Sequence, residues 1–145
     1  MNIKQALKRK NKLVGEIHEE FYKASQYNVV DDGNPRPYSA TEAITKWMQL
    51  TDELVQLKTK IHKANLPIYH RIFELSELKN QVKSLKTLNC TSGKVPGGRW
   101  GESEPVVKHA EINVVEKDKM IKGLELKIEA IQDELDQWNH NTSID

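Results

Sequence analysis

The feature that most limits the fold of this chain is the spacing of its apolar residues, which recur at alternating steps of three and four along most of its length. Such spacing places apolar side chains on one face of an α-helix and is typical of helices that pack along a heptad seam. Hydrophobic residues make up 37% of the chain and charged residues 30%. This balance is typical of long helices that each bury one stripe, so we expect no thick globular core.

Two helices are expected in the first half of the chain. Residues 31–37 hold two prolines and a glycine, so they form a loop between these helices. The second helix begins at Ser39, which caps its first turn, and its apolar stripe is wide enough to pack against two neighbours. The first helix runs from Asn2 to about Tyr27, with a predicted seam of Ile3, Leu7, Val14, Ile17, Phe21 and Ala24. The second stripe comprises Ile44, Trp47, Thr51, Leu54 and Ile61, broadened by Met48, Leu50, Val55 and Leu57.

Two further helices are expected in the second half. Pro67 opens the third helix, since proline is tolerated in a first helical turn, and the chain either kinks or reverses there. Gly123 lies inside the fourth helix, where it suggests a close crossing with another helix. The third helix carries Ile68, Ile72, Leu75, Leu78, Val82 and Leu85. The fourth begins after a capping box at Asn113 and carries Val114, Ile121, Leu124, Ile128, Ile131, Leu135 and Trp138.

A β-hairpin is expected between the third and fourth helices, as an insertion at about residues 90–112. Residues 92–105 hold four of the seven glycines, and the alternation from Val106 to Ile112 favours a strand whose mate lies near Lys94 and Val95 or just before the loop. The predicted fold is mainly α, with long antiparallel helices that have coiled-coil seams, one small β-hairpin and a single elongated domain over residues 1–145. The helices either close into a four-helix bundle or assemble with copies of the chain. We favour a homo-oligomer, because long seams suit packing between chains.

No catalytic or metal-binding motif is complete in the sequence. The pair Gly93–Lys94 lacks the serine or threonine and the leading glycine of a phosphate-binding loop, and the following glycines do not match a dinucleotide fingerprint. The five histidines show no ligand spacing, and Cys90 is the single cysteine. We therefore expect no enzymatic activity, no metal and no cofactor.

The charges of the chain are balanced, with 22 basic and 21 acidic residues. A nucleic-acid binder usually has a basic excess, so we interpret the basic run near the N-terminus as a solvated helix face and expect no nucleic-acid partner. No window reaches the ~20 apolar residues that cross a bilayer, so we expect no membrane partner. The single cysteine and the opening Met1-Asn2-Ile3-Lys4 predict an intracellular, cytoplasmic protein.

The glycine-rich segment is the best candidate for a binding site. Glycines let the backbone approach a ligand, arginine binds anions, and tryptophan stacks on rings. The hypothesis is non-enzymatic capture of a small nucleotide-like anion. The candidate ligand-binding residues are Lys94, Gly97, Gly98, Arg99, Trp100, Glu102, Lys108 and His109. The alternative is a coiled-coil structural or assembly protein without a small-molecule ligand, in which Arg99 pairs with Glu102 or Glu104 and Trp100 folds back onto the helices.

The order of these elements resembles a family of short bacterial and phage proteins often labelled septicolysin-like. The resemblance includes Ile61-His62-Lys63-Ala64-Asn65 at the end of the second helix and Asn139-His140-Asn141-Thr142 near the C-terminus, where His140 replaces the family's tryptophan and Trp138 lies just upstream. The activity of that family is unsettled. In design alone, the chain is also similar to phage proteins that sequester nucleotide immune signals of their hosts. That similarity implies an anti-defence role for an oligomer that holds its ligand at subunit junctions.

Overall fold

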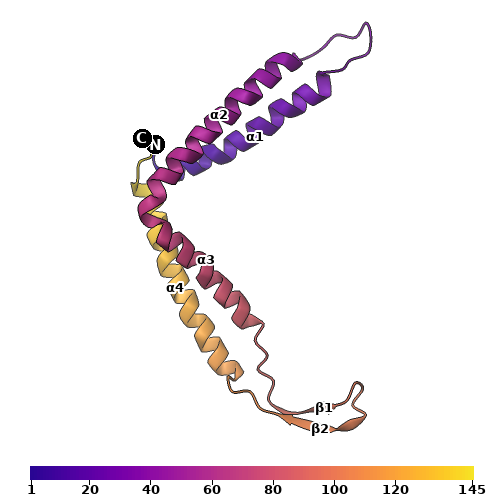
Figure 1. Cartoon of the computed structure of the whole chain (residues 1–145), viewed down its shortest axis with the longest axis vertical. Helices are drawn as coiled ribbons and strands as arrows, with labels where there is room; N and C mark the ends of the chain where they lie inside the picture. Colours follow the sequence, from indigo (N-terminus) through magenta and orange to yellow (C-terminus); the bar gives the residue numbers. More distant parts are fainter. The chain divides into compact units, whose positions relative to one another are not determined.

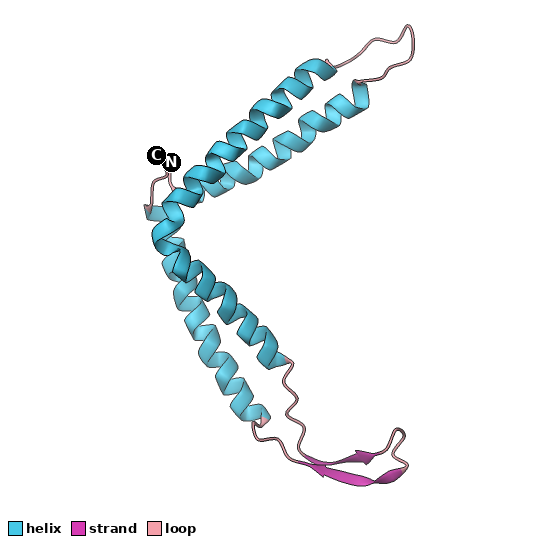
Figure 2. Cartoon of the chain, viewed as in Figure 1, coloured by secondary structure: helices cyan, strands magenta, loops and turns pink.

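The computed structural model describes all 145 residues and is mainly helical, with one two-stranded antiparallel sheet (Figures 1 and 2). The predicted fold class, mainly α with one small β-hairpin, is confirmed at this level. The chain divides into two compact units, Met1–Ile68 with Asp136–Asp145, and Tyr69–Leu135. The elements in order are α1 (Ile3–Tyr27), α2 (Ala40–Asn65), a 3-10 helix (Leu66–Ile68), α3 (Tyr69–Lys86), β1 (Gly93–Gly97), β2 (Ser103–Lys108) and α4 (Val114–Asn141).

Side-chain caps fix the starts of α2 and α4 where the sequence predicts them. The Ser39 hydroxyl accepts a hydrogen bond from the backbone N–H of Glu42 at 3.2 Å. The Asn113 side chain accepts one from the N–H of Glu116 at 2.8 Å, and the Glu116 carboxylate accepts one from the N–H of Asn113 at 3.3 Å. These bonds satisfy backbone donors that have no partner within the helix, so the boundaries follow from local sequence.

In the first unit, α1 and α2 lie side by side as an antiparallel pair (Figure 1). Ala6 and Leu13 of α1 form a buried cluster with Leu57 and Ile61 of α2. Alanines in the buried rows of both helices leave room for the two backbones to approach closely, because interhelical distance depends on the side chains at the contact.

The buried row of α1 differs from the predicted seam by one residue. Of the predicted seam, Ile3 and Ala24 are buried and Leu7 packs against the buried cluster, but the prediction is wrong for Val14, which is 39% exposed, and for Phe21, which is 48% exposed. Two rows with the same spacing lie next to each other on this helix, and α2 packs on the one with the smaller side chains. The buried residues of α1 are Ile3, Ala6, Leu13, Glu20 and Ala24.

Glu20 is the one charged residue among the buried side chains, with 7% of its surface exposed. Its carboxylate forms ion pairs with Lys46 of α2 at 3.1 Å and with Lys23 at 3.3 Å. Hydrogen bonding from Lys46, and then from Lys23, holds the pKa of Glu20 below its ordinary value despite the opposing effect of burial.

A pH dependence of stability follows from this lowered pKa. Ionised Glu20 stabilises the folded state above the pKa of an unfolded glutamate, about 4.3, and the contribution is lost as pH falls through the lower folded pKa. We therefore expect Glu20→Gln to be less stable than the parent protein at pH 7, with the difference shrinking below about pH 4. Urea unfolding at pH 7 and pH 3 measures both values. Glu19→Gln, at the exposed neighbouring position, serves as the control, and a pH-independent difference for Glu20→Gln would contradict the ion-pair role.

The first and last residues of the chain meet in the first unit (Figure 1). Asn2 caps α1 by accepting a hydrogen bond from the N–H of Gln5 at 2.8 Å, and its amide also donates to the carbonyl of His140 at 2.9 Å. The backbone N–H of Ile3 donates to the carbonyl of Thr142 at 3.0 Å. His140 and Thr142, which belong to the C-terminal element noted in the sequence, thus join the chain ends through backbone atoms.

In the second unit, α3 and α4 lie side by side, and their buried residues are those the sequence predicts (Figure 1). Leu75, Leu78 and Val82 are buried on α3, and Ile121 and Ile131 are buried on α4. These helices have one apolar row each, so the periodicity alone identifies which face of each helix is buried.

Gly123 does not mark a close crossing of helices, in contrast to the prediction. A Cβ atom added there would meet no atom within 4 Å. The residue instead lines a groove of about 740 Å³ between α3 and α4, together with Leu85 and Leu124. The chain passes Pro67 in the 3-10 turn Leu66–Ile68. No helix of the protein combines the length and the apolar character that crossing a membrane requires.

Candidate functional site

The candidate binding residues lie on and beside the hairpin of β1 and β2, which belongs to the second unit. Gly93 pairs with Lys108, Lys94 with Val107, Val95 with Val106 and Gly97 with Ser103. The register shifts between Val95 and Gly97, where Pro96, which has no N–H to donate, occupies the irregular position. The predicted mate of the second strand, near Lys94 and Val95, is confirmed. The predicted bounds of that strand, Val106 to Ile112, are wrong, since β2 spans Ser103–Lys108 and residues 109–112 lie outside it.

Glycines at the tip are required by the hairpin itself. A Cβ atom on Gly97 would overlap the carbonyl oxygen of Glu104 on the facing strand. Gly98 and Gly101 have φ angles of 71° and 72°, in the left-handed region where residues with a Cβ are strained. Gly97 is also buried, so its main role is in the close approach of the two strands.

The side chains at the tip point to solvent. Trp100 is 80% exposed, so the interpretation that it folds back onto the helices is wrong. Arg99 forms no ion pair with Glu102 or Glu104, and all three residues are exposed. A cation, an aromatic ring and an acceptor are therefore free at the same turn.

The hairpin does not bring all the predicted residues together. Residues paired across an antiparallel ladder point to the same side and neighbours along a strand to opposite sides, so Lys94 lies with Val107 on one face and Lys108 with Val106 on the other. Lys108 is also five residues from Ser103, about 16 Å at 3.3 Å per residue. Lys108 and His109 therefore lie at the base of the hairpin. The residues that share the tip are Gly97, Gly98, Arg99, Trp100 and Glu102.

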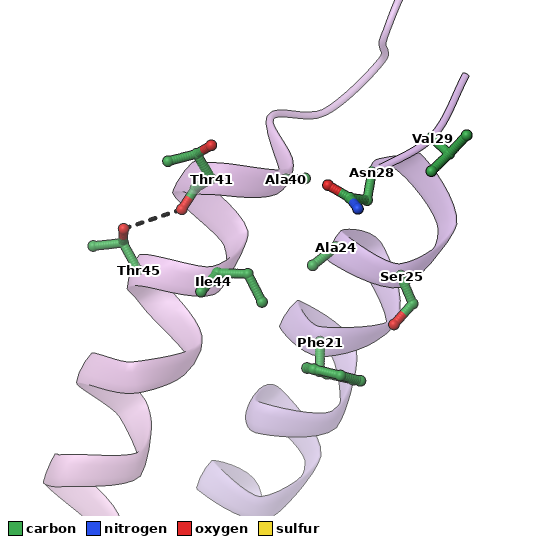
Figure 3. A pocket seen from close by; sticks show the side chains of 9 residues that line it. All are labelled: Phe21, Ala24, Ser25, Asn28, Val29, Ala40, Thr41, Ile44 and Thr45. Atoms are coloured by element: carbon green, nitrogen blue, oxygen red, sulfur yellow. Dashed lines mark hydrogen bonds between the residues drawn. The ribbon is translucent and has the colours of Figure 1, made fainter. Parts of the chain in front are cut away.

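Four surface grooves stand out, and none includes a residue of the hairpin. One lies at the end of the α1 and α2 pair and has a volume of about 470 Å³ (Figure 3). Its walls come from both helices, with Phe21 and Ala24 on α1, Asn28 directly after α1, and Ala40 and Ile44 on α2. The tip of the hairpin is thus an open surface, not an enclosed pocket.

No three of the histidine, cysteine, aspartate and glutamate side chains lie close enough together to hold a metal ion. Cys90 is a free thiol in the loop before β1. The structure places no nucleophile beside a base in the hairpin.

Comparisons with protein-family models, curated proteins and solved structures give no match for this chain. The resemblance to septicolysin-like proteins and the similarity in design to nucleotide-sequestering phage proteins therefore stay predictions.

One feature of the surface was not found from the sequence. The row of α1 that contains Val14 and Phe21 was assigned to the helix pair itself, but both side chains are partly exposed. The signal that identifies such a row is the presence of two adjacent heptad rows on one helix, of which a single partner helix covers only one.

Proposed function

We propose that the protein is a non-enzymatic binding protein that captures a small nucleotide-like anion at the tip of its hairpin. The observation that carries this proposal is the 80% exposure of Trp100 beside an unpaired Arg99. Large aromatic side chains are usually buried, and an exposed one next to a free arginine is the combination that nucleotide-binding surfaces use.

The chemistry of the tip supports a ligand with both a ring and a phosphate. The indole of Trp100 offers a flat face for a base, and stacking of this kind contributes ~1–3 kcal/mol per base. The guanidinium of Arg99 can donate two parallel hydrogen bonds to a phosphate. Glu102 can accept a hydrogen bond from a sugar hydroxyl or a base edge. Sequestration of a nucleotide signal requires binding alone, so this arrangement needs no catalytic group.

The open geometry limits what one tip can do. A stacked ring and one arginine cover only one side of a ligand, and small-molecule sites usually bury most of the ligand surface. The proposal therefore includes a homo-oligomer, with helices packed in a coiled-coil manner, in which tips or neighbouring surfaces of two copies enclose the ligand together.

The test is thermal melting of the full chain against a panel of cyclic dinucleotides and ADP-ribose derivatives. A ligand at roughly 100 times its Kd adds about 2.7 kcal/mol of stability, which appears as a higher Tm. We expect Trp100→Ala and Arg99→Ala to leave the Tm of the ligand-free protein unchanged and to weaken binding about tenfold or more each. Lys108→Ala is the matched control, because it removes a hairpin cation at the base without changing the tip.

Two results would overturn this proposal. If no member of the panel raises the Tm, the hairpin is not a nucleotide site of this class. If Trp100→Ala lowers the Tm of the ligand-free protein by several degrees, the indole has a structural role and its exposure carries no functional meaning.

The alternative function, a structural or assembly protein without a small-molecule ligand, is favoured by a different observation. The pair of α1 and α2 leaves a row of large apolar side chains uncovered on each helix, including Phe21 and Met48. Failure of every ligand together with self-association of the chain would support this alternative.

A further inference from the structure

The first unit consists of two halves of opposite charge, although the formal net charge of the chain is only +1. The half that holds both chain ends, here named the basic half, comprises residues 1–15, 54–68 and 136–145. It contains eight lysine and arginine residues and two carboxylates, Asp136 and Asp145. The other half, residues 16–53, contains three basic residues and eight carboxylates. The side chains thus give the basic half a formal charge of +6 and the other half −5.

The antiparallel packing of α1 on α2 assembles the basic half. Ala6 lies in one buried cluster with Leu57 and Ile61, so the first turns of α1 lie beside the last turns of α2 (Figure 1). The end of the chain joins them, since the Asn2 amide donates to the carbonyl of His140 at 2.9 Å. Only the α1 residues form a run in the sequence, so the full charge is visible only in the fold. The basic residues are Lys4, Lys8, Arg9, Lys10 and Lys12 on α1 and Lys58, Lys60 and Lys63 on α2.

Most cations of the basic half have no carboxylate partner. Arg9 forms ion pairs with Glu16 and Glu53, and Lys12 lies 3.7 Å from Glu16. The axes of packed helices are ~8–10 Å apart, close to the ~8 Å Debye length at physiological ionic strength, so the fields of the remaining charges add. Their mutual repulsion favours binding of an anion. The exposed lysines that form no ion pair are Lys4, Lys8, Lys58, Lys60 and Lys63.

Three of these cations form a row on the outer side of α1. Lys4, Lys8 and Lys12 are four residues apart, so they project from one side of the helix at intervals of about 6 Å along its axis. All three are exposed, so this side faces away from α2. The other residues three positions from Lys8 on this side are Gln5 and Asn11. The row is therefore polar along its whole length.

The surroundings of the row favour a DNA duplex over other polyanions. A helix that binds a membrane surface inserts apolar side chains beside its cations, and this row has none. Single strands are bound by stacking on aromatic rings, but no phenylalanine, tyrosine or tryptophan of the basic half is exposed. A helix ~10–12 Å wide fits the ~12 Å major groove of B-DNA, whereas the major groove of A-form RNA is too narrow.

We propose that the basic half of the first unit binds double-stranded DNA without sequence preference, with the outer side of α1 in the major groove. The lysines of the row reach phosphates at the groove walls, and those of α2 add to the local positive potential. Such contacts release counterions and give affinity without reading bases. The expectation of no nucleic-acid partner was based on the whole chain, in which the carboxylates of residues 16–53 balance this charge. DNA repels those carboxylates, so contact is restricted to the basic half.

The test measures binding of the full chain to a fluorescent DNA duplex of about 20 base pairs, by anisotropy between roughly 50 and 200 mM salt. We expect the logarithm of the binding constant to fall linearly with the logarithm of salt concentration, with a slope of about −3 or steeper. The triple variant Lys4→Gln, Lys8→Gln and Lys12→Gln removes three phosphate contacts. We expect it to reduce the slope by about 3 and the affinity at the lower salt by about tenfold or more.

The matched control is the triple variant Lys119→Gln, Lys122→Gln and Lys127→Gln. It removes three exposed lysines from α4, in the second unit, where eleven basic residues balance eleven carboxylates. We expect its affinity to stay within about twofold of the parent's, because direct phosphate contacts dominate the binding. Circular dichroism verifies that both variants remain helical. If the α1 variant loses helicity, Lys58→Gln with Lys60→Gln and Lys63→Gln tests the same half from α2 and is also expected to reduce the slope.

A parent protein that does not bind the duplex at the lower salt would overturn the proposal. An unchanged slope in the α1 variant, or an equal loss of affinity in the α4 variant, would also overturn it. Tighter binding to an RNA duplex, or to phosphatidylserine vesicles at equal salt, would contradict the choice of DNA.

The proposal is separable from ligand binding by the hairpin. Arg99→Ala with Trp100→Ala changes the tip of the hairpin and leaves the basic half intact, so we expect it to bind the duplex as tightly as the parent. Loss of duplex binding in this variant would assign the DNA contact to the hairpin and overturn the proposal. A nucleotide panel without effect on the Tm leaves the expected DNA binding unchanged.

Discussion

Replacing Leu13 by alanine is expected to lower the free energy of unfolding of the first unit by about 3 kcal/mol, and its Tm by roughly 12–24 °C. Leu13 is fully buried and lies in the cluster with Ala6, Leu57 and Ile61. Truncation removes its transfer free energy and leaves a cavity. In a pair of helices, few other side chains are available to fill that cavity. Urea unfolding followed by circular dichroism measures the loss.

Val14→Ala is the matched control, because it truncates the next residue on the same helix. Val14 is partly exposed within the chain, so the expected loss is below about 1 kcal/mol when the helix pair is studied by itself. If Val14→Ala costs as much as Leu13→Ala, the row of α1 that contacts α2 is the one that contains Val14, as predicted from the sequence.

The two units differ in how well their packing could be predicted, and the reason lies in the number of apolar rows. On α3, the row through Leu75, Leu78 and Val82 is the only apolar one, so periodicity identifies it. On α1, the rows through Leu13 and through Val14 have the same period, and hydrophobicity favours the second. Which row α2 contacts depends on partners that a single helix does not reveal, such as Lys46 beside Glu20.

Local interactions explain which parts of the fold were predictable. The helix starts at Ser39 and Asn113 depend on hydrogen bonds to residues three positions away, so their sequence signals are sufficient. The hairpin was also predictable from its glycines, but the alternation from Val106 to Ile112 misplaced the second strand, which spans Ser103–Lys108. The faces of Lys94 and Lys108 were not, because they depend on the strand register and on the irregularity at Pro96. The candidate site is therefore smaller than the sequence suggested.

Replacing Gly97 by alanine is expected to open the hairpin while the helices stay folded. The added Cβ would overlap the carbonyl oxygen of Glu104, which is a backbone atom of the facing strand and cannot rotate away. An isolated two-stranded hairpin is only marginally stable, so separation of the strands at this pair removes the order of the whole hairpin. Hydrogen exchange along Gly93–Gly97 and Ser103–Lys108 reports the loss, with protection falling about tenfold for each 1.4 kcal/mol of lost stability.

The same substitution at Gly123 is expected to have the opposite effect on stability. No atom lies within 4 Å of its added Cβ, and the position is inside α4, so alanine is expected to raise stability by about 0.5–1 kcal/mol through its higher helix propensity. Opposite signs for the two glycines would separate a steric requirement at the hairpin from the general cost of glycine. If Gly97→Ala keeps its exchange protection, the two strands do not approach as closely as the structure has them. The placement of Arg99 and Trp100 together at one tip would then be unsupported.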